Sequence, residues 1–533
     1  MSGANAVRPA FAAAMLRRVS KKRGKVYLLG GGPGDPELIT VRAKRRLAEA
    51  DLVLYDALIH PDLLAFARPD AKLEFVGKRA GRVSERQAGI NARLVEAARA
   101  GLVVARLKGG DPYLFGRGSE EAEHLAAEGI EFEVVPGVPS PLAATAYAGV
   151  SLSHRDLASS VAYITATESD EKQASAHDWS KLATATQTLV IFMGVRKLAP
   201  LMETLVQNGR AASCPAMVIQ SASLPSQRTV IGTVETIAEL ASAAAIGMPA
   251  LTIVGDVVTL RERLRWYDRQ PLFGKRVLVP RASEQAAAMA QLLRDAGAEP
   301  VVAPAIRIAP PEDPALLQQA VRDAGLYGWL AFTSANGVHA FFHELREQGG
   351  DARRLGSARV AAIGPATAAA LRDNGIAPDV IAQEFVGEAV ADAILARHGK
   401  GPRPLRVLLA RAAVARDALP DRLRAAGAEV DVVAAYRTLP PLPEDATRLR
   451  SLIVDGGVDV VTFTSSSTVE QTLAAIGEGA TAALAKLTVA GIGPITRDTA
   501  LARGVRVDVM AESYTTAGLV TALAQHFTAK EQA

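Results

Sequence analysis

Short apolar runs alternate with helix-like segments along most of the chain, and this alternation predicts an α/β fold. After residue 29, for example, a glycine-rich stretch leads into apolar positions with helical spacing, from about residue 40 to residue 50. In the first quarter of the chain, strand-like runs occupy 25–29, 51–55, 72–76 and 102–105. Parallel strands joined by helices place their carboxyl ends at one edge of a sheet, where ligands bind in open α/β sheets.

The predicted strand ends carry residues suited to ligand chemistry, namely Pro33, Asp56, Lys78 and Asp111. The longest of these connections, RLKGGDPYLFGRGSEE at 106–121, leads into a helical pattern that runs from Glu120 to Glu128. A plain strand-to-helix connection needs about two to six residues and no Gly-Gly-Asp-Pro. The glycine loop at 30–36 matches neither a P-loop nor GxGxxG, because it lacks the Lys-Ser/Thr pair and contains Pro33 and Asp35. We therefore expect one shared binding site of another kind at this edge.

Composition narrows the class of protein. The 533 residues suggest three or four compact units, 49% of them are hydrophobic, and the single cysteine, Cys214, excludes a disulfide framework and favours the cytoplasm. A net charge of +4 does not argue for nucleic acid, and no apolar run approaches the ~20 residues that span a membrane. His339 and His343 share a helix face without a third ligand, so no metal site is expected. Residues 1–23 are basic and alanine-rich and are predicted to form a disordered tail.

Six motifs follow one another in a recognisable order: GGGPGDPELIT, YDALIH, VGKRAG, RLKGGDPYLFGRGSEE, VVPGVPS and AYAGVSLSHRD. FMG at 192–194 and MPALTIVGDVV at 248–258 continue the series. This order resembles the uroporphyrinogen-III C-methyltransferases of the tetrapyrrole methylase family, over residues 24–265. The resemblance implies two α/β subdomains with the active site between them, usually in a homodimer.

The resemblance also implies roles for single residues. The pocket for S-adenosylmethionine would be lined by Pro33, Gly109, Gly110, Asp111, Leu114, Pro139, Ser140, Met193, Ala222 and Ala250. Asp56 and Lys78 match the positions of a proton acceptor and a proton donor, and Arg117, Glu120 and Arg155 match residues that face the tetrapyrrole. Arginine suits a substrate with eight carboxylates because its guanidinium binds them bidentately.

Structural alternatives remain open for several of these residues. Asp56 would also serve as a helix N-cap, Lys78 as a solvated surface lysine, and Arg155 as the partner of Asp156. The sequence departs from the family pattern at Pro139-Ser140, Ala222, Ser119 and His60. Pro139 removes a backbone N–H and a hydroxyl beside the cofactor, which would weaken cofactor binding.

Beyond a predicted linker at 266–273, the chain repeats itself. RVLVPR at 276–281 returns as RVLLAR at 406–411, FTS at 332–334 returns at 463–465, and IGPAT at 363–367 returns as IGPIT at 492–496. The separation of about 130 residues is far longer than the ~20–50 of solenoid repeats, and it predicts two copies of a domain-sized α/β unit.

The motifs FTSANGV, AAIGPAT, AAYRT and AGIGPIT make residues 274–528 similar to uroporphyrinogen-III synthase, a family with two lobes joined by a two-strand connection. This resemblance implies that Tyr436 contacts the leaving group and that Thr496 lies near the substrate, with Ile495 where a second threonine is often found. Ser334, Ser465 and Ser466 are candidate carboxylate anchors. Plain helix capping by the serines and a core position for Tyr436 are the alternatives.

Together the two resemblances imply a bifunctional enzyme. The second half would cyclise hydroxymethylbilane to uroporphyrinogen III, and the first would methylate it at C-2 and C-7 to precorrin-2 for sirohaem or cobalamin. S-adenosylmethionine and tetrapyrroles are the expected ligands, with no metal, nucleic acid or membrane. A methylase of other specificity, acting on another tetrapyrrole position, RNA or protein, and a non-catalytic, tetrapyrrole-sensing second half are the alternatives. No NAD fingerprint is present, and residues 529–533 are expected to form a tail.

Overall fold

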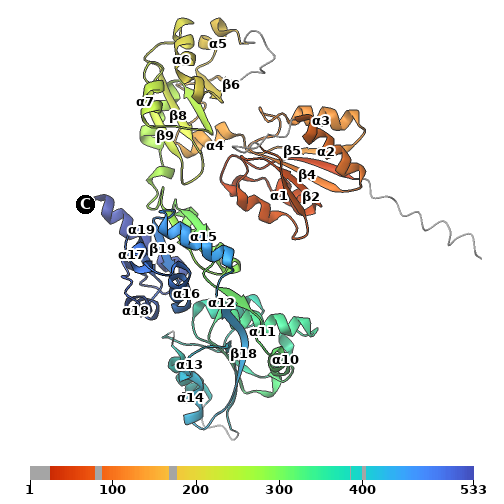
Figure 1. Ribbon diagram of the computed structural model, residues 1–533, viewed down its shortest axis with the longest axis vertical. Coiled ribbons are helices and arrows are strands. Elements are labelled where there is room, and N and C mark those ends of the chain that lie inside the picture. Colours follow the sequence, from red (N-terminus) through yellow and green to blue (C-terminus); the bar gives the residue numbers. More distant parts are fainter. Residues whose placement is uncertain (1–23, 78–86, 167–176, 385, 399–403, 533) are drawn as a thin grey trace, which may run out of the picture. The chain divides into compact units, whose positions relative to one another are not determined.

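The computed structural model describes residues 24–77, 87–166, 177–384, 386–398 and 404–532 (Figure 1). The chain divides between Gly274 and Lys275 into two compact units. Each unit contains two sheets with helices packed on them, so the predicted α/β class is confirmed. None of the described helices is long and apolar enough to span a membrane.

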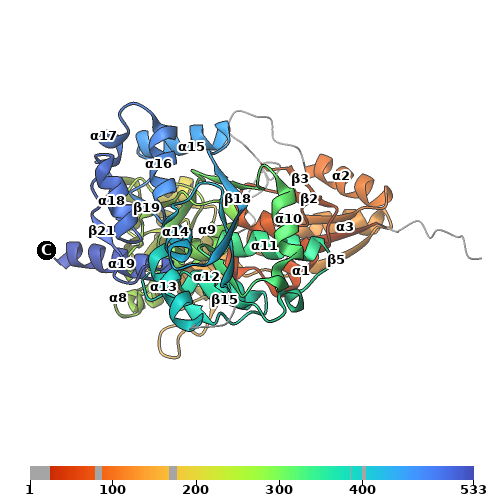
Figure 2. The ribbon, with the colours of Figure 1, turned by 90° about the horizontal axis from the view of Figure 1, so that it is seen from below.

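The first sheet is entirely parallel and has the strand order β3-β2-β4-β1-β5. Its strands are β1 (Lys25–Gly30), β2 (Leu52–Tyr55), β3 (Lys72–Phe75), β4 (Val103–Lys108) and β5 (Glu131–Val135). Helix α1 (Val41–Glu49) covers one face, and α2 (Gln87–Arg99) and α3 (Gly118–Ala127) cover the other (Figure 2). The loops after these parallel strands therefore leave the sheet at the same edge, as the strand pattern predicts.

Strand β1 illustrates why these residues form a buried central strand. Val26 and Leu28 pack against α2 and α3, whereas Tyr27 and Leu29 pack against α1. Successive side chains of a strand point to opposite faces, so a continuous apolar run supplies both layers of the core.

The second sheet, in the order β6-β7-β10-β8-β9, is mixed. Strands β6 (Val161–Thr165) and β7 (Thr188–Phe192) are parallel, and β10 (Ala250–Val254), β8 (Pro215–Gln220) and β9 (Arg228–Thr233) continue it in antiparallel fashion. Its helices are α4 (Ser140–Tyr147), α5 (Trp179–Ala185), α6 (Leu198–Gln207), α7 (Ile237–Ala243) and α8 (Arg261–Leu264).

The segment 266–273, expected as a linker, packs against the first unit. The Trp266 indole N–H donates to the Ala146 carbonyl at 2.9 Å, and Tyr267 and Leu272 are buried. Tyr267 also meets the ring of Tyr147, with centroids 4.8 Å apart. These aromatic contacts extend the first unit to Gly274.

In the second unit, the two sheets share an equivalent order of five strands, and one of them has β13 as an additional edge strand. One is β12-β11-β19-β20-β21, and the other is β13-β18-β17-β14-β15-β16. The strands are β11 (Arg276–Val279), β12 (Glu299–Val302), β13 (Arg307–Ala309), β14 (Trp329–Phe332), β15 (Arg359–Ala362), β16 (Val380–Ile381), β17 (Arg406–Ala412), β18 (Glu429–Leu439), β19 (Val460–Phe463), β20 (Thr488–Gly491) and β21 (Val509–Met510). The repeated sequences RVLV and RVLL lie on β11 and β17, but β11 pairs with β19 and β17 pairs with β14. Each lobe therefore combines strands from both copies of the sequence repeat.

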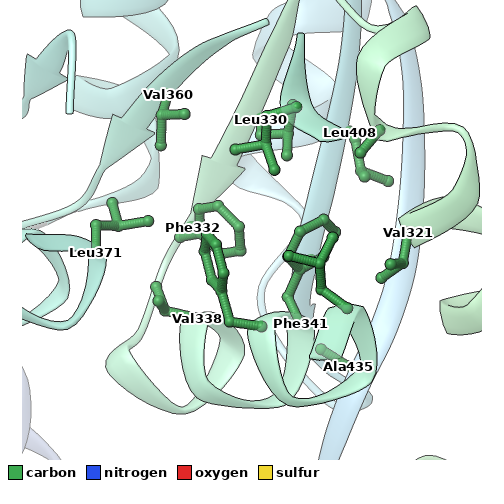
Figure 3. Close-up of a cluster of buried hydrophobic side chains, with 14 of the residues drawn as sticks. Val321, Leu330, Phe332, Val338, Phe341, Val360, Leu371, Leu408 and Ala435 are labelled. Atoms are coloured by element: carbon green, nitrogen blue, oxygen red, sulfur yellow. The ribbon is translucent and has the colours of Figure 1, made fainter. Parts of the chain in front are cut away.

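Helices follow the strands of each lobe closely. They are α9 (Ser283–Asp295), α10 (Pro314–Arg322), α11 (Ala335–Glu347), α12 (Pro365–Asp373), α13 (Gly387–His398), α14 (Ala418–Ala425), α15 (Pro443–Val454), α16 (Ser466–Ile476), α17 (Ala480–Leu484), α18 (Pro494–Ala502) and α19 (Thr516–Gln532). In the core of the six-stranded lobe, Phe332 of β14 meets Phe341 of α11 edge to face, with ring centroids 5.5 Å apart (Figure 3). His339 and His343 lie on the exposed face of α11.

Candidate functional site

Hydrogen bonds join the loops after β1, β4 and β5 at the carboxyl edge of the first sheet. Gly32 and Gly110 exchange two backbone hydrogen bonds, with N···O distances of 3.3 and 2.7 Å. The Asp111 carboxylate accepts the Gly137 N–H at 3.0 Å through one oxygen and the Tyr113 N–H at 2.8 Å through the other. Asp111 therefore fixes the shape of the loop with both carboxylate oxygens.

Two glycines in these loops are required by close backbone approach. A Cβ on Gly137 would lie 2.2 Å from the Gly110 carbonyl oxygen, and a Cβ on Gly109 would lie 2.6 Å from Leu58 Cβ. Gly110 has φ +69°, and a Cβ placed there would meet nothing nearer than Ser140 N at 3.8 Å. The Gly110 backbone thus borders open space, where a ligand is able to approach it closely.

Asp56 lies at the end of β2, beside a buried group of charges. Its Oδ1 accepts the Leu58 N–H at 3.1 Å, and its Oδ2 lies 3.6 Å from Arg106 Nη2. Asp56 therefore closes a turn and does not cap a helix. Arg106 Nε and Lys108 Nζ both reach Glu121 Oε1, at 3.1 and 3.0 Å. Burial, followed by the nearby Arg106 charge, lowers the pKa of Lys108, although the Glu121 carboxylate opposes this shift.

Arg117 and Glu120 form an exposed pair at the start of α3. Arg117 donates to the two Glu120 carboxylate oxygens at 2.9 and 2.6 Å. This bidentate hydrogen bond raises the pKa of Arg117 and lowers that of Glu120. Both side chains are about half exposed, so the pair is accessible to a charged ligand.

Within the first unit, loops of the two sheets meet. The Phe115 ring, after β4, packs on Phe192 at the end of β7, with centroids 4.8 Å apart. Asp35 ties the glycine loop to the other sheet, because its N–H donates to Ser223 Oγ at 3.1 Å and its carboxylate accepts the Tyr147 hydroxyl at 2.8 Å. The loops of both sheets therefore contribute to the same region.

Several residues of these loops adopt a backbone conformation that favours glycine. Phe115, Arg117, Met193, Ser221 and Ser223 have φ values between 50° and 61°. A non-glycine residue in this region is strained by about 1–3 kcal/mol, and such residues gather at functional sites. All five lie in loops that follow β4, β7 or β8, at the candidate site.

In the second unit, a hydroxyl pair lies where β14 passes into α11. Ser334 Oγ caps α11 by accepting the Gly337 N–H at 3.1 Å, and it lies 3.0 Å from the Tyr436 hydroxyl of β18. Tyr436 is only 8% exposed and its ring belongs to the core. The tyrosine thus has both a core position and a polar end.

At the equivalent place in the other lobe, Ser465 caps α16 through the Thr468 N–H at 3.3 Å. Ser466 Oγ lies 2.7 Å from Thr499 Oγ1, and Thr496 is buried in α18. Ser334 and Ser465 therefore both act as helix caps, and the backbone N–H groups at these helix starts are further candidates for anion binding.

Comparisons with known proteins match each half of the chain to a protein family. The family model Tetrapyrrole (Corrin/Porphyrin) Methylases matches residues 25–238, and Uroporphyrinogen-III synthase HemD matches 287–521. The Porphyrin biosynthesis protein HemD of Ruminiclostridium josui is 36% identical over 504 residues, which cover 94% of this chain and 98% of that protein. The chain belongs to both families, as a fusion of a methylase and a synthase domain.

Two further relatives are named as methyltransferases. The Uroporphyrinogen-III C-methyltransferase of Bacillus subtilis (strain 168) is 39% identical over 382 residues, 71% of this chain and 78% of that protein. A crystal structure of uroporphyrin-III C-methyl transferase from Thermus thermophilus complexed with S-adenosyl homocysteine is 40% identical. The match covers 44% of this chain and 100% of the chain in that crystal structure, with a TM-score of 0.39.

The structure brings most of the expected methylase residues to one region. Ser140, at the start of α4, approaches Gly110, and Pro139 precedes it without a side-chain cap. Pro33 and Leu114 lie in the loops after β1 and β4, Met193 follows β7, Ala222 follows β8 and Ala250 begins β10.

The structure says less about Arg155 and Lys78, the other residues that the resemblance assigns to the methylase site. Arg155 is exposed, and in the described part of the chain no ion pair joins it to Asp156, so the structural alternative for Arg155 is not seen. Lys78 lies outside the described residues. The roles of all these residues stay predictions.

Sequence reasoning missed the charges buried behind Asp56. Arg106, Lys108 and Glu121 are at most 4% exposed. A signal was present, since two basic residues at alternate positions of an apolar strand must share one face and need an acidic partner when buried.

Proposed function

We propose that the synthase half cyclises hydroxymethylbilane to uroporphyrinogen III and that the methylase half methylates this product at C-2 and C-7 to precorrin-2. The observation that supports this most is the fusion itself, since the product of one half is the substrate of the other. A relative named for porphyrin biosynthesis aligns with 94% of this chain. The product would feed sirohaem or cobalamin synthesis, in the cytoplasm, which a single cysteine favours.

S-adenosylmethionine, when bound, supplies an electrophilic methyl group on a sulfonium. The open backbone beside Gly110 fits such a ligand, and we assign the lining to Pro33, Gly109, Gly110, Leu114, Pro139, Ser140, Met193, Ala222 and Ala250. Asp111 contributes to the site by holding the shape of the loop, because both of its carboxylate oxygens already accept backbone N–H groups. Pro139 presents a carbonyl, which accepts the Leu142 N–H at 3.1 Å, so its missing N–H does not disrupt the start of α4.

Methylation of a pyrrole carbon requires that a proton leave a neighbouring carbon. We assign its acceptance to Asp56, whose carboxylate faces Arg106, and we assign Lys78 as the donor on resemblance alone. Arg117, Glu120 and Arg155 would orient the substrate. Binding of a substrate carboxylate by Arg117 replaces or extends its pairing with Glu120.

In the synthase half, we assign the contact with the departing hydroxyl to Tyr436. Ser334 lies 3.0 Å from that phenol and would orient it. Ser465, Ser466 and Thr496, with the adjacent helix N-termini, would hold substrate carboxylates. A homodimer formed through the methylase half completes the proposal.

The methylase assignment is tested directly by supplying purified chain with uroporphyrinogen III and S-adenosylmethionine under anaerobic conditions. We expect two methyl groups to be added, as measured by mass spectrometry after oxidation, and we expect Asp56→Asn to lose at least tenfold in rate. Addition of no methyl group by the wild-type chain would overturn the assignment. Methylation at other positions would favour a tetrapyrrole methylase of different specificity.

A further inference from the structure

Two loops of the candidate cofactor site touch each other through their backbones. The glycine loop at 30–36 carries Pro33, and the loop after β8 carries Ala222. A Cβ on Gly34 would lie 2.6 Å from the Ala222 carbonyl oxygen and 2.8 Å from Ser223 Oγ. The spacing between Pro33 and Ala222 is therefore set at this contact.

Asp35 holds the contact with its backbone and its side chain. Its N–H donates to Ser223 Oγ at 3.1 Å, and Ser223 is only 2% exposed. Asp35 Oδ1 accepts the Glu37 N–H at 2.9 Å and so caps the turn that follows the loop, whereas Oδ2 accepts the Tyr147 hydroxyl at 2.8 Å. A hydrogen bond to a carboxylate is stronger than one between neutral groups, so the Tyr147 phenol is a firm tie between α4 and the glycine loop.

The Tyr147 ring is held by two aromatic residues of the segment that precedes the second unit. Its centroid lies 5.2 Å from that of Trp266 and 4.8 Å from that of Tyr267. Tyr267 is 6% exposed, and its hydroxyl lies 3.5 Å from the Ser223 carbonyl oxygen. Burial, followed by the hydrogen bond to the carboxylate, raises the pKa of Tyr147, so the phenol keeps the proton that it donates.

Gln227 ties the end of α4 to the same group. Its Oε1 accepts the Ser223 N–H at 2.9 Å, and its Nε2 donates to the Tyr147 carbonyl at 3.4 Å. The start of α4 carries Ser140, which is also assigned to the cofactor site. Tyr147 thus connects three parts of the proposed lining, namely the glycine loop, the loop after β8 and α4.

We propose that Tyr147 is a positioning residue for S-adenosylmethionine, because its hydrogen bond to Asp35 sets the spacing of the loops that form the cofactor site. Trp266 and Tyr267 hold the Tyr147 ring, so the segment immediately before the synthase half is part of this arrangement. The inference rests on the proposed methyltransferase function, and it assigns these residues an indirect effect on cofactor affinity.

Tyr147→Phe in the full chain is the first test, because it removes the hydroxyl and keeps the ring. We expect S-adenosylhomocysteine to bind about tenfold more weakly in isothermal titration. The KM for S-adenosylmethionine should rise by a similar factor, while kcat for methylation of uroporphyrinogen III stays within about twofold, since the bound cofactor orders the loops again. Partial unfolding alone would do the reverse, because fewer active molecules lower kcat and leave KM unchanged.

Tyr27→Phe is the matched control. The Tyr27 hydroxyl also donates to a carboxylate of the same unit, Glu49 Oε2, at 3.0 Å, but it lies outside the candidate cofactor site. This variant should lose a similar amount of stability in thermal unfolding and keep the wild-type affinity for S-adenosylhomocysteine. Equal affinities of Tyr147→Phe and Tyr27→Phe would overturn the inference.

A double-mutant cycle tests whether Tyr147 acts through Asp35. Asp35→Asn keeps an oxygen that accepts the Glu37 N–H and removes the carboxylate that accepts the phenol. Because both changes break the same hydrogen bond, we expect about tenfold weaker binding in each single variant and no more than about twentyfold in the double variant. Independent effects would multiply to roughly 100-fold and would contradict the proposed route.

Trp266→Leu tests the part played by the segment. It removes the ring beside Tyr147 and the indole N–H that donates to the Ala146 carbonyl at 2.9 Å. We expect S-adenosylhomocysteine to bind about threefold more weakly, because the Tyr147 ring loses one of its two aromatic neighbours. Wild-type affinity in this variant would show that the segment has no role in the cofactor site.

Hydrogen–deuterium exchange of the ligand-free chain gives a readout that depends on neither activity nor cofactor. The Asp35 and Leu38 N–H groups are hydrogen-bonded, so a peptide covering residues 30–39 reports on the order of the glycine loop. We expect this peptide to exchange faster in Tyr147→Phe than in the wild type and in Tyr27→Phe, and unchanged exchange would refute the positioning role. A wild-type chain that does not bind S-adenosylhomocysteine would instead refute the proposed function, while the exchange would still decide whether Tyr147 holds the loop.

Discussion

Gly137→Ala is a sharp test of the cofactor site, because the loops after β1, β4 and β5 touch at this residue. The added Cβ would lie 2.2 Å from the Gly110 carbonyl oxygen and 2.8 Å from Gly30 Cα. Both are backbone atoms, which do not swing aside as the end of a side chain does. The φ of Gly137 is outside the left-handed region, so the effect is steric.

The size of the perturbation follows from these distances. Ordinary contacts are about 3.5–4.0 Å, so the loops must separate by more than ~1 Å. This separation strains the hydrogen bond of 3.0 Å between Gly137 N and the Asp111 carboxylate. Overpacking costs about 1–3 kcal/mol, and a displacement of ~1 Å in a site reduces a rate by about 10²-fold. We expect S-adenosylhomocysteine to bind roughly 100-fold more weakly, equivalent to about 2.8 kcal/mol.

Isothermal titration with S-adenosylhomocysteine measures this loss. Gly247→Ala is the control, because a Cβ there would meet only Gln220 Nε2, at 3.6 Å. Synthase activity of the same chain reports whether the second unit is intact. Wild-type affinity in Gly137→Ala would show that the ligand does not depend on these loops.

Three further predictions concern single groups. Asp111→Ala removes both acceptors of the loop and should weaken S-adenosylhomocysteine binding by about 10–100-fold in the same titration, with an unchanged affinity contradicting the loop's role. Tyr436→Phe should slow formation of the type III isomer at least tenfold while lowering the free energy of unfolding by only about 1 kcal/mol; unchanged turnover would make Tyr436 a core residue alone. Burial raises the pKa of the Cys214 thiol, so stability falls as pH rises above the ordinary value of about 8.5, and alkylation at pH 8 should be slower than that of free cysteine; equal rates would refute this.

Much of the fold could be predicted because local patterns and global topology agree. The strand predicted at 25–29 is β1 (Lys25–Gly30), and the helix predicted at 40–50 is α1 (Val41–Glu49). The repeat of about 130 residues gives two lobes with equivalent strand orders, but β11 pairs with β19 and β17 with β14, so each lobe combines strands of both copies. The repeat alone does not report this exchange of strands between the copies.

Strand β4 shows where the pattern fails. The apolar run ends at Ala105, but the strand continues to Lys108, because Arg106 and Lys108 are paired with buried Glu121. That partner lies 13 to 15 residues further along the chain, on α3. Hydrophobic periodicity does not report such a pairing, which depends on the tertiary packing of the helix.

At the candidate site, the sequence predicted which loops meet but not how they are held. The resemblance places Asp111 in the lining of the cofactor pocket, but it does not show that both carboxylate oxygens accept backbone N–H groups. The positive φ values of Phe115 and Met193 are also hidden from the sequence, because residues of these types carry no preference for that conformation. Only the surrounding contacts impose it.

The central claim is that the two halves catalyse consecutive reactions, and one assay tests it most directly. Freshly generated hydroxymethylbilane is supplied to the purified chain with and without S-adenosylmethionine, and the oxidised products are separated chromatographically. The account predicts uroporphyrin III without the methyl donor and a dimethylated product with it. Formation of the type I isomer alone would contradict the claim and favour a second half that binds tetrapyrroles without converting them.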